Sequence, residues 1–150
     1  MEVNFEEVWN RVKGTEQKDE LQQLYDFAAE EHMAAADYSR LADCTGSLRA
    51  KKLFRELAAE EREHEKQLRA CLYLRKGKET DQRPKTVSKR GGMLLRELRR
   101  LYDNEQKSAD AYSAAAKNLG DDQLRILYAQ LAEREREHGK ALWKLLMELM

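Results

Sequence analysis

The sequence predicts an all-α protein: a four-helix bundle made of two helical hairpins joined by a long crossover, with a short N-terminal helix. The 150 residues include one proline and seven glycines, so little interrupts long helices. Apolar residues recur at alternating spacings of four and three, which is the packing pattern of a four-helix bundle. The second half of the chain also repeats the first at an offset of 74 residues. Residues 1–150 are therefore expected to form a single domain.

Residues 1–14 are predicted to form the short N-terminal helix. Asn4 can cap it, and Gly14 is expected to end it. A helix of this length is not stable alone, so we expect it to pack on the bundle or on a second subunit.

Residues 15–75 are predicted to form hairpin one. Its first helix runs to about Asp43, Gly46 and Ser47 form the turn, and the second helix runs to about Arg75. The buried stripe contains, on the first helix and then the second, Leu24, Phe27, Glu31, Ala34, Tyr38, Leu41, Ala50, Phe54, Leu57, Glu61, His64, Leu68 and Cys71.

Residues 76–90 are predicted to form the crossover. They contain the only proline and six basic side chains. Fifteen extended residues reach about 50 Å, whereas a helix of about 28 residues is about 42 Å long. The connection can therefore cross the whole bundle. Its basic charge suits an anion or an acidic partner, although a solvated connection explains it as well.

Residues 91–150 are predicted to form hairpin two, with its turn at Gly120 and Asp121. The buried stripe contains Leu94, Leu98, Leu101, Glu105, Ser108, Tyr112, Ala115, Leu119, Leu124, Tyr128, Leu131, Glu135, His138, Leu142, Leu145 and Leu149.

The internal repeat is specific. Residues 21–68 overlay residues 95–142 without a gap, and 17 of the 48 positions are identical, against about three to four expected by chance in so biased a chain. The matched pairs include Glu31 with Glu105, Tyr38 with Tyr112, Gly46 with Gly120, Glu61 with Glu135 and His64 with His138.

The two turns predict the height of the polar residues on the stripe. The two glutamates of each hairpin lie fifteen residues before and fifteen residues after the turn glycine. They are therefore expected at one level, about 22 Å from the turn. Each histidine follows its glutamate by three residues and shares its helix face. Packing the hairpins together thus gathers six side chains at mid-bundle.

A buried group of four carboxylates demands positive charge, because uncompensated buried carboxylates are too costly to keep ionised. Two divalent cations neutralise four carboxylates. The sequence therefore predicts a dinuclear metal site, and a metal-free polar core is the alternative. Mixed carboxylate and imidazole ligands suit iron or manganese. His32 aligns with Gln106 and points off the stripe, so we expect it at the surface.

Composition excludes several classes of protein. Lysines plus arginines equal aspartates plus glutamates at 28 each, which argues against a nucleic-acid binder. The two cysteines, Cys44 and Cys71, form no metal-binding pair and are expected to be buried. No signal-peptide pattern and no apolar run of about 20 residues is present. We therefore expect a cytoplasmic protein without a membrane span.

The repeated motifs resemble the rubrerythrin family of ferritin-like di-iron carboxylate proteins. The resemblance lies in a glutamate followed seven residues later by tyrosine, as in Glu31 and Tyr38, and in F-x-x-x-A-x-x-E-x-x-H, which ends at Glu61 and His64. It implies a ferritin-like bundle with two iron ions. Manganese is the alternative metal, and zinc is expected to substitute.

The resemblance also implies ligand roles. Glu31 and Glu105 would be terminal or bridging ligands, Glu61 and Glu135 would bridge the metals, and His64 and His138 would each bind one metal. Tyr38 and Tyr112 would either hydrogen-bond ligand carboxylates, act in electron transfer, or simply pack in the core.

The resemblance implies an oxidoreductase that reduces peroxide or dioxygen at the dinuclear site. The sequence has no four-cysteine rubredoxin domain, so electrons would come from a separate donor protein. The family's additional glutamate is replaced by Ser108, and the six-ligand set is equally similar to bacterioferritin-type ferroxidase centres. Iron oxidation for storage or detoxification is therefore an alternative. A non-enzymatic helical interaction module stabilised by metal is another, with the apolar stripe around Trp9 and the Leu142–Met150 tail as partner surfaces. A homodimer or higher homo-oligomer is expected.

Overall fold

The chain forms four α-helices. The computed structural model describes residues 5–77, 83–86 and 93–150, and for residues 5–19 only the backbone is described. The helices are α1 (Phe5–Cys44), α2 (Leu48–Lys76), α3 (Leu94–Lys117) and α4 (Asp122–Leu149). The described residues contain no strand, which confirms the all-α four-helix bundle.

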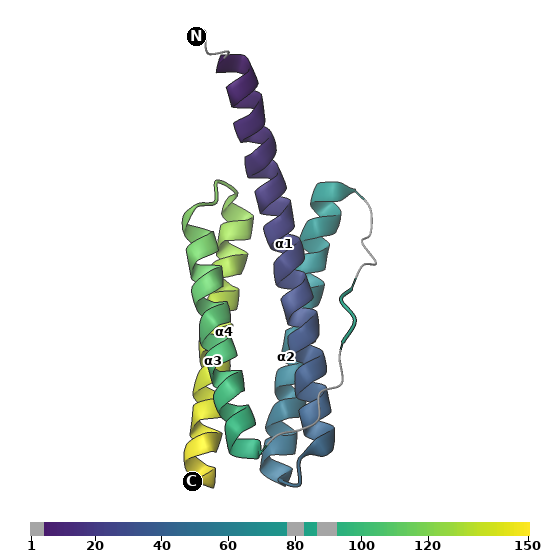
Figure 1. The fold of residues 1–150 in the computed structure, drawn as a ribbon, viewed down its shortest axis with the longest axis vertical. Coiled ribbons are helices and arrows are strands. Elements are labelled where there is room, and N and C mark those ends of the chain that lie inside the picture. The colour runs from purple at the N-terminus through teal and green to yellow at the C-terminus, as the bar shows by residue number, and fades with distance from the viewer. Residues whose placement is uncertain (1–4, 78–82, 87–92) are drawn as a thin grey trace.

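The bundle consists of two helical hairpins (Figure 1). Hairpin one is α1 and α2, hairpin two is α3 and α4, and close backbone contact is concentrated within each hairpin, with a smaller contact between α2 and α4. Helix α2 ends at one end of the bundle and α3 begins at the other, so α3 runs parallel to α2 (Figure 1). The ion pair between Arg49 at the start of α2 and Glu148 at the end of α4 fixes the antiparallel order of these two helices. This helix order is the one predicted for two hairpins joined by a long crossover, although residues 78–82 and 87–90 of the predicted crossover lie outside the described part.

The predicted break at Gly14 is wrong. Helix α1 runs without interruption from Phe5 to Cys44, so residues 1–14 do not form a separate short helix, and residues 1–4 lie outside the described part. A glycine inside a helix costs only about 1 kcal/mol relative to alanine. The flanking residues contain no proline and continue the helix on both sides of Gly14.

Polar caps begin the second helix of each hairpin. The Ser47 side chain accepts a hydrogen bond from the Ala50 N–H at 3.2 Å, and the Asp121 carboxylate accepts one from the Leu124 N–H at 3.1 Å. These bonds satisfy backbone donors that a helix start otherwise leaves open. Asp121 also pairs with Arg75 at the end of α2, so this cap links the two hairpins.

The apolar core has two parts separated by a polar level. One cluster contains Phe27, Tyr112 and Tyr128, and the other contains Tyr38 and Phe54. The six predicted ligand residues are the charged side chains that lie between these clusters. Large aromatic rings therefore flank the polar level above and below.

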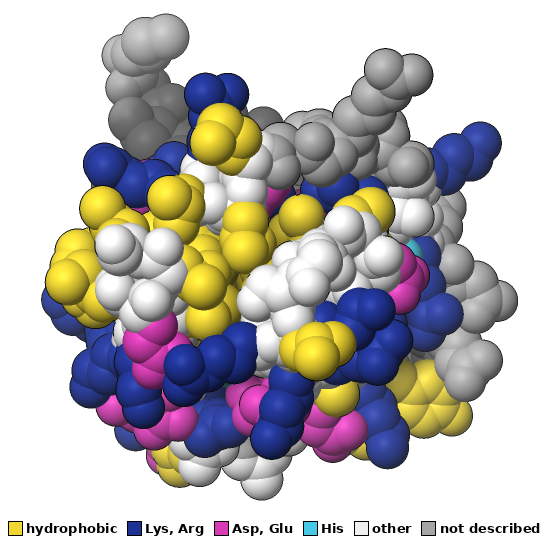
Figure 2. Space-filling view, turned by 90° about the horizontal axis from the view of Figure 1, so that it is seen from below, with side chains coloured by type: hydrophobic (Ala, Val, Ile, Leu, Met, Phe, Trp, Pro, Cys, Tyr) yellow, Lys and Arg dark blue, Asp and Glu magenta, His cyan; other side chains and the backbone are white. Residues whose placement is uncertain are grey.

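One end of the bundle is apolar. Hydrophobic side chains gather there in Figure 2, around the starts of α2 and α3 and the end of α4. Leu48, Met93, Met147 and Met150 are among the exposed large hydrophobic residues. The partner surface expected at the α4 end stays a prediction.

The two cysteines are less buried than expected. Cys44, the last residue of α1, is exposed, and Cys71 is half-buried. The α1–α2 turn follows Cys44 directly, so no neighbouring helix covers it. Among the described residues, no helix combines the length and the apolar character that crossing a membrane would require.

Candidate metal centre

Each helix contributes to a cluster of six buried polar side chains at mid-bundle. Helix α1 supplies one glutamate and α3 supplies another, while α2 and α4 each supply a glutamate and a histidine one turn apart. All six are at most 5% exposed. This cluster, which we call the Glu4His2 cluster, comprises Glu31, Glu61, His64, Glu105, Glu135 and His138.

The cluster divides into two groups that share two residues. Glu31, Glu61, His64 and Glu135 can bring one ligand atom each to within 4.8 Å of one another, and so can Glu61, Glu105, Glu135 and His138. Glu61 and Glu135 belong to both groups. Two neighbouring metal ions would therefore each have two glutamates in common and one glutamate and one histidine of their own. The exclusive residues of each group come from one hairpin.

The histidines obey the same two-fold pattern. His64 Nδ1 lies 3.1 Å from Glu135 Oε1 of the opposite hairpin and 3.6 Å from Glu61 Oε2 of its own helix. His138 Nδ1 lies 2.7 Å from Glu61 Oε1 of the opposite hairpin and 3.6 Å from Glu135 Oε2 of its own helix. The two imidazole rings are almost parallel, with centroids 5.7 Å apart. Both rings therefore turn Nδ1 toward the shared carboxylates.

Several buried atoms of the cluster lack a hydrogen-bond partner. Among the described residues, Glu31 Oε2, Glu61 Oε1, Glu105 Oε2 and His138 Nδ1 make no hydrogen bond. His138 Nδ1 and Glu61 Oε1 lie close together but are not aligned as donor and acceptor. Buried polar atoms are normally satisfied, and these all face the interior of the cluster. Two divalent cations, one in each four-residue group, would satisfy all four atoms, so the donor set fits a dinuclear metal site.

The side chains compensate their charges with protons when no cation is bound. Burial alone would lower the pKa of His64, but hydrogen bonds and attraction from Glu135 and Glu61 raise it to about 9. Burial, together with a hydrogen bond shared with Glu105, raises the pKa of Glu135 to about 8. The surrounding carboxylates likewise raise the pKa of His138 despite its burial. A metal ion would displace these protons, because metal ligands must be deprotonated.

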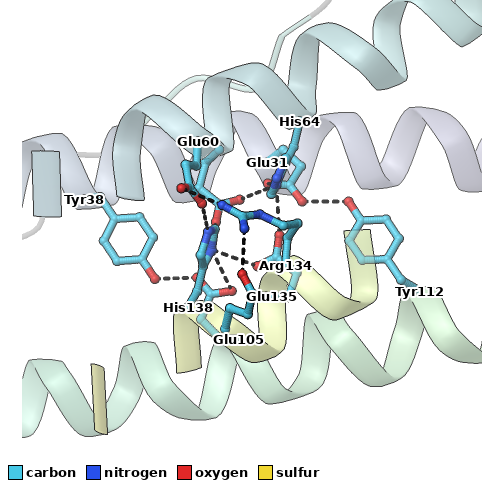
Figure 3. Close-up of polar contacts among 11 residues, drawn as sticks. Glu31, Tyr38, Glu60, His64, Glu105, Tyr112, Arg134, Glu135 and His138 are labelled. Atoms are coloured by element: carbon cyan, nitrogen blue, oxygen red, sulfur yellow. Dashed lines mark hydrogen bonds and ion pairs between the residues drawn. The ribbon is translucent and has the colours of Figure 1, made fainter. Parts of the chain in front are cut away.

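Two tyrosines reach across the bundle to the terminal glutamates (Figure 3). Tyr38 on α1 donates a hydrogen bond to Glu105 on α3, and Tyr112 on α3 donates one to Glu31 on α1 at 2.7 Å. Burial first, and then nearby carboxylates, raise the pKa of both phenols, so both stay protonated donors. Each tyrosine thus fixes one oxygen of a carboxylate and leaves the other directed at the cluster.

Sequence reasoning missed one partner of the cluster. Glu60 contacts His138 Nε2 and also binds Arg134 at 2.7 Å (Figure 3). A ligand histidine commonly donates its second N–H to a carboxylate, which orients the ring. Glu60 was overlooked because its repeat equivalent is Arg134, and only matched glutamates were considered. Its position directly before Glu61 was the available signal.

His32 lies outside both groups of the cluster, as expected, and instead contacts Glu65 at 3.1 Å. A cavity of about 50 Å³ lies against the cluster between α1 and α3. Its lining includes ligand carboxylates together with Ser108, Asn104 and Glu30. This volume accommodates a few waters or one small molecule of similar size. Through this cavity the cluster is open to small molecules.

Comparison with known proteins supplies a family. The model of the rubrerythrin family matches residues 24–146, a span that contains all six residues of the Glu4His2 cluster and both tyrosines. No curated protein sequence matches the chain.

Proposed function

Because the chain belongs to the rubrerythrin family, we propose that it is a di-iron oxidoreductase, which reduces peroxide or dioxygen with electrons from a separate donor protein. The observation that carries this proposal is the sharing of Glu61 and Glu135 between two four-residue groups. Shared carboxylates hold two ions close together and couple them. Carboxylate and imidazole ligands suit iron and manganese, and the family favours iron.

The ligand roles follow from the two groups. Glu61 and Glu135 would contact both ions, Glu31 and His64 would complete one position, and Glu105 and His138 would complete the other. Two irons held by these residues would supply one-electron redox chemistry at each position.

The chain's own side chains prepare this site in three ways. The tyrosines hold the terminal carboxylates in place through hydrogen bonds. Glu60 holds His138 by its second nitrogen. The apolar clusters flank the site on either side, while the cavity of about 50 Å³ leaves room for an oxidant of two oxygen atoms. The side chains therefore select for small oxidants by size.

Ferroxidation for iron storage or detoxification is the second candidate. The exposed carboxylate of Glu30 lines the cavity beside the ligand carboxylates. An acidic entrance attracts a cation such as ferrous iron as substrate. A non-enzymatic module with a structural metal would instead leave the cavity unused.

Anaerobic loading with ferrous iron, followed by stopped-flow mixing with peroxide or dioxygen, tests the proposal. We expect two irons per chain to be oxidised, and further turnover to need an added electron donor. Continued oxidation of excess ferrous iron by a large hollow oligomer in light scattering would favour ferroxidation. Stabilisation by zinc with no reaction toward either oxidant would favour the structural module.

A matched pair of variants tests the ligand assignment. The double variant Glu61→Ala/Glu135→Ala should lose iron binding and the absorbance change. The control is Glu63→Ala/Glu137→Ala, which removes two exposed glutamates at equivalent positions of the same helices. Retention of the absorbance change in the first double variant would contradict the assignment.

A further inference from the structure

A groove lies on the outer face of hairpin one, away from the Glu4His2 cluster. It is formed by α1, α2 and residues 83–86 of the crossover, and it encloses about 800 Å³. Pockets that bind small organic molecules measure about 300–1,000 Å³. The groove is therefore large enough for a molecule of mononucleotide size.

The groove is locally basic in a protein whose total charge is zero. Four permanently charged cations line it, namely Arg62, Lys66, Arg69 and Arg83, against the single carboxylate of Glu65. Four positive charges and one negative charge leave a net charge of +3. A concentration of positive charge in a partly enclosed groove attracts anions.

Glu65 arranges the cations. Its side chain is 8% exposed, and it contacts Arg69 Nε at 2.6 Å, Arg83 Nε at 3.2 Å and His32 Nδ1 at 3.1 Å. Both arginines bind it through Nε, so one carboxylate fixes two guanidinium groups side by side. Paired, oriented guanidinium groups match the oxygens of a phosphate better than mobile lysines do.

Small apolar side chains and one aromatic ring also line the groove. Ala35, Ala36 and Ala70 leave space along the two helices. Tyr73, one helical turn after Arg69, lines the same groove, and its side chain is half exposed. A flat aromatic ring beside an anion site provides a surface on which a planar group can stack.

The equivalent face of hairpin two keeps two of the groove's cations but differs at the residues that arrange them. Gly139 replaces Glu65, and Trp143 replaces Arg69 and packs on Tyr102 with ring centroids 5.5 Å apart. Gln106, the equivalent of His32, lies where it would come within 2.9 Å of a Cβ at Gly139. The basic groove is therefore particular to hairpin one rather than a consequence of the repeated fold.

We propose that this groove binds an organic phosphate of mononucleotide size, with its phosphates at Arg69 and Arg83 and its planar part on Tyr73. The site is independent of the Glu4His2 cluster, so it stands or falls separately from the proposed oxidoreductase activity.

Calorimetric titration of the full chain with ADP, pyrophosphate and adenosine tests the proposal. We expect ADP and pyrophosphate to bind, ADP more tightly with a Kd below about 100 µM, and adenosine not to bind. Absence of binding by both phosphate probes at millimolar concentration would overturn the site. Equal affinities for ADP and pyrophosphate would overturn the role given to Tyr73.

Variants locate the binding. Arg69→Gln and Arg83→Gln should each weaken ADP binding at least tenfold, and Tyr73→Ala should weaken ADP but not pyrophosphate. Arg83 lies outside the helices and its side chain is 58% exposed, so Arg83→Gln keeps the fold and leaves the candidate metal ligands untouched. If Arg83→Gln bound ADP as tightly as the wild type, the nucleotide would bind elsewhere on the protein, for example at the Glu4His2 cluster, and the proposal would be wrong.

Lys140 is the repeat equivalent of Lys66 on hairpin two and provides the matched control. Lys66→Gln should weaken pyrophosphate binding, while Lys140→Gln should leave it unchanged. Equal losses would show only diffuse attraction to a charged surface and would overturn the proposal. So would a dimer in light scattering that buries the groove and binds no phosphate probe.

Discussion

Hairpin one and hairpin two carry the same candidate ligands at the same level, but the residues around those ligands differ. Within the cluster, Glu31 and Glu105 are equivalent, and each accepts a hydrogen bond from a tyrosine of the opposite hairpin. The two hairpins differ at the residue directly before each shared glutamate, which is Glu60 in hairpin one and Arg134 in hairpin two. On the outer faces, a buried carboxylate in hairpin one corresponds to Gly139 in hairpin two.

This difference separates two demands on the repeat. Side chains that would face two metal ions are identical in both halves, because each ion needs the same donors. The residues that contact the cluster from outside are free to differ, and they would make two metal positions unequal. His138 has a carboxylate at its second nitrogen, whereas the equivalent carboxylate for His64 is replaced by an arginine.

We expect the largest effect from removing a glutamate that belongs to only one of the two four-residue groups. Glu31→Ala and Glu105→Ala should each lower the metal content from two ions per chain to one, since each glutamate belongs to only one four-residue group. Removing one of four buried carboxylates also reduces their mutual repulsion, so both variants should fold. Metal analysis after loading with ferrous iron measures the content. Loss of both ions in either variant would contradict independent positions.

The pH dependence of the metal-free protein should be the next largest effect. The pKa of His64 is raised from 6.5 to about 9, so its contribution to stability is complete below pH 6.5 and is lost as pH rises toward 9. The raised pKa of Glu135, from 4.5 to about 8, acts in the same direction between those values. We expect the free energy of unfolding to fall by on the order of 5 kcal/mol between pH 6 and pH 9, with about half from each group.

Denaturant titrations of chelator-treated protein across this pH range give the measurement. Metal-loaded protein is the control and should not lose stability as pH rises, because ions replace the protons. His64→Gln should flatten the upper part of the metal-free curve. A metal-free protein that is more stable at pH 9 than at pH 6 would rule out the proposed charge compensation.

The two tyrosines test whether the halves are energetically equal. Tyr38→Phe and Tyr112→Phe should each destabilise the protein by about 1.5–3 kcal/mol, because each leaves a buried carboxylate oxygen without its donor. Chemical denaturation compares the two variants with the wild type. Tyr73→Phe, at a tyrosine whose side chain is 50% exposed, serves as the control. A large loss of stability in only one of the two variants would show that the two hydrogen bonds contribute unequally to stability.

The smallest effect should come from Glu60 and Arg134, the equivalent positions at which the two hairpins differ. Glu60→Gln should weaken the metal position of His138 by about tenfold, the lower end of the range for partners of ligand histidines, since Glu60 is 38% exposed. Arg134→Gln should change metal affinity less, because it contacts Glu60 rather than a candidate ligand. Competition with a metal-sensitive chelator dye measures both affinities. Equal losses in the two variants would remove the distinction between the positions.

The repeat explains why much of the fold and the cluster follows from sequence. Equal spacing of Glu31 and Glu61 about Gly46 determines their common height without knowledge of the packing. The repeat does not reveal Glu60, because its equivalent in hairpin two is not a glutamate. Its contact with His138 connects the two hairpins. The break at Gly14 was wrong because one glycine costs less than the flanking residues gain by continuing the helix.

The outer groove shows another limit of pattern reading. Glu65 and Arg69 look like an ordinary pair of surface charges spaced one turn apart on a helix. Arg83 approaches Glu65 from the crossover, outside the helices, and adds a second guanidinium group to its carboxylate. Contacts made by irregular segments leave no periodic signal in the sequence.

The parallel course of α2 and α3 has a consequence for the timing of assembly. Contacts within each hairpin join residues close in sequence, so each hairpin can form early and fast. Docking the hairpins must wait until the crossover has spanned the bundle, a closure whose entropic cost is met late. Until then each half of the chain displays only two glutamates and a histidine. We therefore expect a newly made chain to complete its cluster in the last step of folding, and to take up metal after folding rather than to fold around it.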